Sequence, residues 1–404
     1  MMSKNNLKRS NKRHCTNAPP PQIDKNKPVN TTAVFGVNQL WTNVYPYDST
    51  FDPIRLDVQF IDNPSCPAGS SCENTSNWIS WKPWEKAWVA YVITNSIMKC
   101  ANIKFIFHIN DNNLPNGKTV FDIRISRLLN QGCYSYIGTD SLTSNNNVGA
   151  SMNFGWMDAP LDYTFTYNGI SYTTDANFNQ GGYSQGAGST IIHEFCHAVG
   201  MYHELQSPFN NPLIFNSQNT LNYFSQNDGW LSAQTNTNVL DLETASSKNG
   251  STFDQYSIMK YSLPACLLTN GSIKQGDCAN FIECSTVNGL NANTNNDCAN
   301  FINQENVGFL DNNVLSQNGG YIQQFNDSLS PLDCTWLATN YPNSKNINVS
   351  NYIENLKEHQ KLKTEIDSKS DSKLDSKLYS KLKKKNIIMI VCIALIVISL
   401  LQII

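Results

Sequence analysis

The sequence predicts an α+β fold, in which several strands come first and a helix then crosses beneath the sheet that they form. Short segments that alternate apolar and polar residues, or that are rich in β-branched and aromatic residues, follow one another between residues 56 and 154. Such segments are typical of strands. A Gly-rich stretch at residues 181–190 then precedes a segment with two histidines four residues apart, which is the spacing of one helix face.

Four segments are predicted to be strands. The first alternates apolar and polar residues, and the segments that begin at residues 103 and 120 read IKFIFH and VFDIRI. His108, at the end of IKFIFH, is interpreted as an ordinary strand residue rather than a ligand. The predicted strands are Leu56–Phe60, Ile103–His108, Val120–Ile125 and Gly149–Phe154.

The segment Trp81–Lys99, between the first two strands, admits two interpretations. As a helix it would carry Trp84, Trp88 and Tyr91 along one side. Alternatively, it would break into strands at the run Val89–Thr94, which is rich in β-branched residues.

Residues 193–204 read HEFCHAVGMYHE and carry the strongest functional signal. On a helix, His193 and His197 would share one face with roughly 5–6 Å between their Cβ atoms, so both imidazoles can reach one zinc ion. Gly200 can take the left-handed conformation that ends a helix, and His203 can then close a three-histidine site. Glu194 lies where its carboxylate can reach a water at the open fourth position of the zinc.

The alternative interpretation is an ordinary helix surface, since two histidines four residues apart often occur without a metal. The glycine and the third histidine at fixed spacing match the longer signature of catalytic zinc sites. The sequence therefore predicts one catalytic zinc ion, on a helix for which Ser189 or Thr190 is the expected N-cap.

The two ends of the 404-residue chain differ from its middle. Residues 1–37 are basic and Pro-rich without the apolar core of a signal peptide, and we expect them to be disordered. Residues 38–340 are predicted to form the catalytic domain, and residues 341–385 a charged stalk in which Asp-Ser-Lys recurs. The net charge of −3 offers no basic field, so no nucleic-acid partner is expected.

The final segment, Ile387–Ile404, is apolar and uncharged. As a helix it would be about 27 Å long, so residues 386–404 are predicted to be a transmembrane helix in a lipid bilayer. The lysine-rich segment Lys381–Lys385 precedes it, and the positive-inside tendency then places the globular part on the cytoplasmic side. The expected localisation is a single-pass membrane protein with a C-terminal anchor.

The cysteines point to a different compartment. Of the twelve, Cys66 and Cys72 and the cluster Cys266, Cys278, Cys284 and Cys298 lie in Gly-, Ser- and Asn-rich sequence, which suggests disulfides and an oxidising environment. A second zinc site is the competing interpretation, but no CxxC pair supports it. A virus that oxidises thiols in the cytoplasm would reconcile the two indications, and the side of the membrane stays open.

Downstream of the histidines, residues 253–261 read FDQYSIMKY. By composition alone Met259 is an ordinary core residue. Together with HEFCHAVGMYHE, however, the SIMKY turn resembles the Met-turn of the metzincin zinc endopeptidases, and the chain is most similar to their astacin-like group. DIRIS (122–126), GCYSYIGTD (132–140) and ASMNFGW (150–156) complete the resemblance, which covers residues 38–330.

The resemblance implies a two-lobed domain with a cleft, a twisted mixed sheet and active-site helix in the N-terminal lobe, and an irregular C-terminal lobe. His193, His197 and His203 match the zinc ligands of the family, and Met259 its Met-turn. Glu194 matches the general base. Tyr261 matches the tyrosine that stabilises the oxyanion. ASMNFGW matches the edge strand that pairs with an extended peptide substrate.

The chain also departs from the family pattern. Residues 181–190 contain no cysteine, so the partner of Cys133 is open. Cys196 occupies a position within HExxH that is usually apolar and would act there as a small hydrophobe. The LQSP that follows Glu204 differs from the family, and no counterpart of the propeptide aspartate is visible, so substrate contacts and latency do not transfer.

These observations predict a membrane-anchored, zinc-dependent endopeptidase that acts on a protein or peptide substrate. The alternative from another class is a catalytically silent, membrane-anchored structural or adhesion protein that retains the zinc fold. A narrower alternative is a zinc hydrolase that acts on a non-peptide amide. The presence of all three histidines and of Glu194 favours the peptidase.

Overall fold

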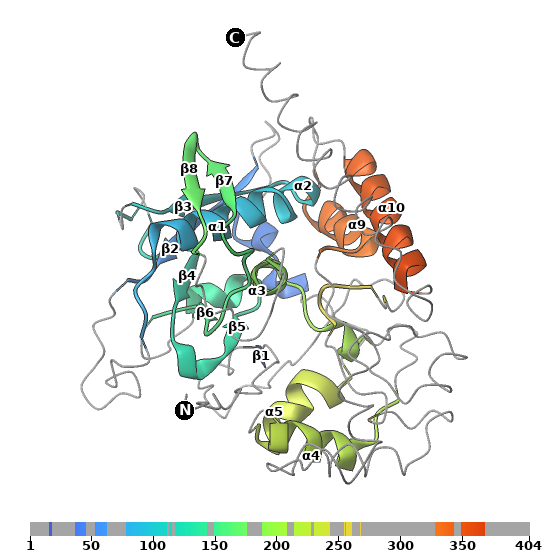
Figure 1. The fold of residues 1–404 in the computed structure, drawn as a ribbon. Helices are drawn as coiled ribbons and strands as arrows, with labels where there is room; N and C mark the ends of the chain where they lie inside the picture. Colours follow the sequence, from blue (N-terminus) through green and yellow to red (C-terminus); the bar gives the residue numbers. More distant parts are fainter. Residues whose placement is uncertain are drawn as a thin grey trace, which may run out of the picture. The chain divides into compact units, whose positions relative to one another are not determined.

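The computed structural model (Figure 1) divides the chain into two units, Met1–Ile353 and Glu354–Ile404. The predicted domain boundaries at residues 37, 340 and 385 stay predictions. The residues that the structure describes are 16–17, 37–45, 53–62, 78–110, 113–114, 118–143, 149–175, 188–207, 214–227, 230–242, 254, 256–260, 267, 328–342 and 349–367.

A six-stranded mixed sheet with the order β1-β5-β6-β4-β2-β3 forms the centre of the first unit. The pairing of β5 with β6 is antiparallel, and the other four pairings are parallel. The strands are β1 (Thr16–Asn17), β2 (Ile54–Phe60), β3 (Ile103–His108), β4 (Ile123–Ser126), β5 (Cys133–Ser135) and β6 (Met152–Phe154). A separate hairpin consists of β7 (Thr164–Tyr167) and β8 (Ile170–Thr173).

All four predicted strands are present, and the predicted combination of a mixed sheet with helices is confirmed. The expectation that ASMNFGW forms an edge strand is wrong, because β6 within this segment is an inner strand between β5 and β4. Sequence could not reveal this, because Cys133–Ser135 was not among the predicted strands and forms a strand on the outer side of β6.

The segment Trp81–Lys99 is helical, which decides between the two interpretations. Helix α1 (Pro83–Thr94) begins with a proline at its first position, where proline is favoured, and the Glu85 carboxylate accepts the Lys82 N–H at 2.9 Å. The β-branched residues of this helix are almost all buried, and tertiary packing overrides their strand propensity. Helix α2 (Ile97–Cys100) follows.

Helix α3 (Ser189–Ala198) lies against the sheet (Figure 1), as predicted. The buried ring of Phe195 packs on the rings of Phe105 and Phe107 of β3, with centroids 5.3 and 6.0 Å apart. The helix that carries HEFCH therefore has one face in the core.

Helix α9 (Pro331–Asn340) is joined covalently to α2 by the disulfide Cys100–Cys334. In the described ranges the other helices are α4 (Ser217–Asn227), α5 (Ser232–Thr235) and α10 (Val349–Asp367), with a π-helical turn at Asn236–Leu240. Short 3-10 segments lie at Val37–Gln39, Trp41–Asn43, Leu129–Gln131, Gly138–Thr143 and Glu204–Gln206.

The predicted membrane localisation is corrected. Within the described ranges, no helix is both long enough and apolar enough to cross a bilayer. The longest, α10, has 19 residues but reads VSNYIENLKEHQKLKTEID, which is polar and charged along its length. The segments Lys381–Lys385 and Ile387–Ile404, on which the prediction depended, lie outside the described residues.

Candidate metal centre

The start of α3 is held by a carboxylate from elsewhere in the chain. Asp158 Oδ2 accepts the N–H groups of Gly188 and Ser189 at 3.0 and 2.6 Å and the Ser189 hydroxyl at 2.8 Å, and Oδ1 accepts the Thr190 N–H at 3.1 Å. The prediction that Ser189 or Thr190 is the N-cap is therefore wrong, because both lie inside the helix. The Asp158 carboxylate instead accepts hydrogen bonds from the first N–H groups, and it lies at the positive end of the helix dipole.

The end of α3 was predicted correctly at Gly200. Its φ of +102° is a conformation that glycine adopts at little cost, and its N–H donates to the His197 carbonyl at 2.8 Å. Two side chains cap the next carbonyls. Trp41 Nε1 donates to Ala198 at 2.7 Å, and the Tyr341 hydroxyl donates to Val199 at 2.8 Å.

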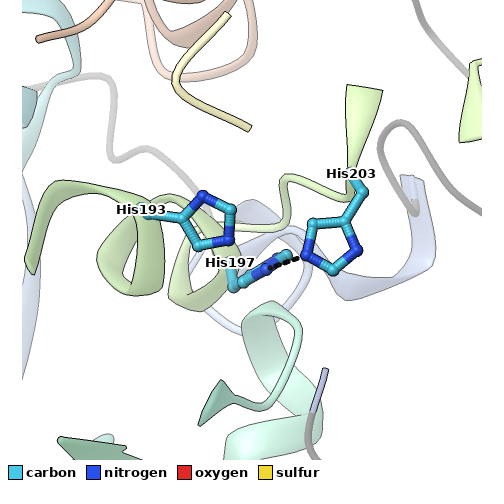
Figure 2. A group of neighbouring side chains, drawn as sticks. All are labelled: His193, His197 and His203. Carbon is cyan, nitrogen blue, oxygen red and sulfur yellow. Dashed lines mark hydrogen bonds between the residues drawn. The ribbon is translucent and has the colours of Figure 1, made fainter. Parts of the chain in front are cut away.

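The three predicted histidines converge as expected (Figure 2). His193 and His197 lie on one face of α3, and His203 follows the turn at Gly200. All three are buried, and their potential ligand atoms lie within 4.8 Å of one another. His197 Nε2 lies 3.1 Å from His203 Nε2. Two nitrogen atoms that bind the same metal ion are expected to lie this close.

Backbone carbonyls fix the orientation of two of these rings. Nδ1 of His193 lies 2.9 Å from the Ile258 carbonyl, and Nδ1 of His197 lies 2.6 Å from the Met201 carbonyl. A carbonyl can only accept, so each Nδ1 carries the proton and each Nε2 keeps its lone pair. Carbonyl partners of this kind orient metal-binding histidines in known sites.

Burial also keeps these imidazoles neutral. It lowers the pKa of His193 to about 4, against the smaller opposing effect of the bond to Ile258. Burial, and then the neighbouring His193, lower the pKa of His197 well below its usual value. Zinc binds the neutral form of imidazole, and three nitrogen donors with one position left open suit it. The group fits a single zinc ion.

Of the other predicted site residues, the structure describes Glu194 and Met259. Glu194 is completely buried within α3, next to His193. Met259 is completely buried in a turn, and its carbonyl accepts the Glu204 N–H at 3.0 Å. Tyr261 lies outside the described residues.

Among the described residues, neither His108 nor the free cysteines Cys133 and Cys196 join the metal group. His108 Nε2 lies 2.8 Å from the Asp57 carboxylate. Cys133 and Cys196 are buried free thiols, and burial, with smaller contributions from Asp333 and Glu194, raises the pKa of Cys196 well above its usual value. Cys196 is therefore a neutral thiol and packs as the small hydrophobe that was expected.

Sequence analysis missed a buried polar network behind the Met259 turn. The Glu204 carboxylate accepts the Asp254 N–H at 2.7 Å, and the Ser330 hydroxyl donates to the Asp254 carboxylate at 2.5 Å. Lys260 is buried beside these carboxylates; its burial lowers its pKa to about 7, while Asp254 and Glu204 act in the opposite direction. In the sequence, the segment SPLD at 330–333 is typical of the start of a helix. It gives no indication that this helix contacts the network.

No protein-family model matches the chain, and no curated protein matches it in sequence. A comparison with solved structures finds several chains that are similar to part of this one. One structure of myroilysin is 21% identical in sequence and has a TM-score of 0.45; the match covers 77% of this chain and 99% of that one. Another structure of myroilysin is 23% identical and has a TM-score of 0.35; the match covers 74% of this chain and 88% of that one. High choriolytic enzyme 1, a hatching enzyme zinc-protease from Oryzias latipes, is 16% identical in sequence and has a TM-score of 0.31. This match covers 60% of this chain and 82% of that one.

Proposed function

We propose that the chain is a zinc-dependent endopeptidase of the astacin-like kind, which hydrolyses peptide bonds in a protein or peptide substrate. The observation that supports this most is the convergence of three buried histidines whose potential ligand atoms lie within 4.8 Å of one another. Three histidines with an open fourth position are typical of catalytic rather than structural zinc. The motif that carries them belongs to the metzincin signature.

His193, His197 and His203 would hold the ion. When bound, zinc lowers the pKa of a water towards 7 and polarises the scissile carbonyl. Glu194, fixed in α3 beside the first ligand, would take a proton from the attacking water and deliver it to the leaving amine. Tyr261 would donate a hydrogen bond to the developing oxyanion.

Met259 would take no part in proton transfer. Its buried side chain belongs to the turn whose Ile258 carbonyl lies against His193. We propose that it gives the histidines a rigid apolar base.

The proposal is tested with the full-length chain, prepared under oxidising conditions so that Cys100 and Cys334 can pair. Zinc content is measured together with cleavage of an unfolded protein, before and after dialysis against a chelator and after zinc is returned. We expect about one zinc per chain and cleavage that disappears and returns with the metal. Cleavage that persists in metal-free protein would reject the proposal. Zinc binding without any cleavage would favour the catalytically silent alternative.

A further inference from the structure

We propose that Asp333, at the start of α9, is a positioning residue for His193: it holds the Met259 turn so that the Ile258 carbonyl meets the imidazole. The inference rests on the proposed function only in that His193 is taken as a metal ligand. Asp333 is 75 positions from Ile258 in the sequence, and the structure brings the two residues into direct contact.

The Asp333 carboxylate is buried and accepts three hydrogen bonds. Oδ1 accepts the Ser257 hydroxyl at 2.7 Å, and Oδ2 accepts the N–H groups of Ile258 and Ser330, both at 2.9 Å. Only the bond from Ser330 belongs to the capping box of α9. The other two go to the turn, so the carboxylate does more than start its own helix.

The path from Asp333 to the metal group is one residue long. Ile258 donates its N–H to Asp333 and presents its carbonyl to Nδ1 of His193 at 2.9 Å. Ser257 strengthens the hold, because its hydroxyl oxygen also accepts the Met259 N–H at 3.0 Å. Three consecutive residues of the turn are thus fixed directly or indirectly by one carboxylate.

The position of Asp333 is itself secured from both sides. The next residue, Cys334, forms the disulfide with Cys100 at the end of α2. The neighbouring Ser330 hydroxyl donates to Asp254, whose N–H reaches the Glu204 carboxylate beside His203. The start of α9 is therefore linked to His193 through Ile258 and, through Asp254, to the side chain of Glu204 next to His203. These links suit a residue that sets the geometry of the histidines.

The test is Asp333→Asn in the full-length chain. An amide has one acceptor oxygen in place of two, so its nitrogen would face either the Ser257 hydroxyl or the Ile258 N–H. We expect a folded protein whose zinc affinity, measured by competition with a chromophoric chelator, falls by ~10- to 100-fold, as for other residues that orient metal ligands. The visible absorption of the Co²⁺-loaded protein should change as the ligand geometry relaxes.

Asp122→Asn is the matched control. Asp122 is also a buried carboxylate, and it accepts the Tyr45 hydroxyl and the Asp57 N–H at 2.8 and 2.7 Å. Its substitution should lower stability and leave the zinc affinity and the Co²⁺ spectrum as in the wild type. If Asp333→Asn does not fold, Ser257→Ala replaces it, because this change removes a turn contact and leaves the α9 capping box intact; a several-fold loss of zinc affinity is then expected.

Wild-type zinc affinity in folded Asp333→Asn, or in Ser257→Ala where that variant is used, would overturn the inference. This failure differs from failure of the proposed function. A wild-type chain that binds zinc and cleaves nothing would reject the peptidase, while a loss of affinity in Asp333→Asn would still support the positioning role. A wild-type chain that cleaves peptides beside an Asp333→Asn variant with unchanged affinity would reject only the positioning role.

Discussion

At the scale of single residues, the metal group depends on imidazoles that stay neutral below the pH at which free histidine becomes protonated. The pKa of His193 falls from 6.5 to about 4 because the ring is buried. The folded state therefore binds fewer protons than the unfolded state between these two values. By linkage, the stabilising contribution of the neutral ring is fully present above pH 6.5 and is lost as the pH falls towards 4.

We predict that metal-free wild-type protein loses about 3 kcal/mol of this contribution between pH 7 and pH 4. Urea unfolding at several pH values measures it. Burial raises the pKa of Glu204 and of Asp333, and raised carboxyl pKa values act in the opposite direction. The informative quantity is therefore the difference between the wild type and His193→Gln. A difference that does not change with pH would contradict the prediction.

Sequence alone could identify the three histidines but not what holds them. Their spacing of four and then six residues is local, so helix geometry determines that they can meet. The residues that orient them lie far away in the sequence, such as Ile258 for His193. No periodicity encodes a contact over that distance.

At the scale of secondary-structure elements, α3 is positioned by side chains beyond both of its ends. Asp158 satisfies three N–H groups and one hydroxyl at its start. We predict that Asp158→Asn destabilises the protein by about 2–4 kcal/mol, since an amide can satisfy only part of these buried donors. Ser189→Ala, which removes one of the four bonds, should cost about 1 kcal/mol. Chemical unfolding curves compare the two, and an equal cost would contradict the assignment of Asp158 as the cap.

The close approach of α3 to α1 gives a second prediction at this scale. Gly188 has a φ of +88°, and an added Cβ would lie 2.6 Å from Val92 Cγ2. Gly169 has a similar φ of +77° but open space around the same position. Gly169→Ala should therefore cost only about 1–2 kcal/mol for the left-handed backbone. Gly188→Ala should cost about 1–3 kcal/mol more because of the overpacked site. Equal shifts in thermal unfolding would show that the helices do not pack this closely.

The predictable elements were those with a strong local pattern. The segment IKFIFH forms β3 with the predicted bounds. Helix α3, which carries His193 and His197, ends just before Gly200, as its glycine predicted. The N-cap of α3 could not be predicted, because Asp158 lies about 30 residues before the donors that it serves. The order of strands also depends on pairing between distant segments, which explains why β6 was placed wrongly at an edge.

At the scale of the whole molecule, the disulfide Cys100–Cys334 closes a loop between residues 234 positions apart. Such a crosslink limits the unfolded chain, and it also fixes α9 beside α2. We predict that the double variant Cys100→Ala/Cys334→Ala loses about 2–5 kcal/mol of stability. Unfolding of the variant and of the wild type under the same oxidising conditions measures the loss. Identical unfolding midpoints for the variant and the wild type would show that the disulfide does not stabilise the folded protein.

The proposed peptidase activity requires the buried three-histidine group and the Glu194 carboxylate together, and the variant Glu194→Gln removes only the carboxylate. The amide keeps the size of the side chain but cannot take a proton from water. Cleavage of an unfolded protein and zinc content are measured side by side on the full-length wild type and variant. We predict equal zinc content and a loss of at least ~100-fold in turnover. A variant that binds zinc and cleaves at the wild-type rate would exclude Glu194 as the general base.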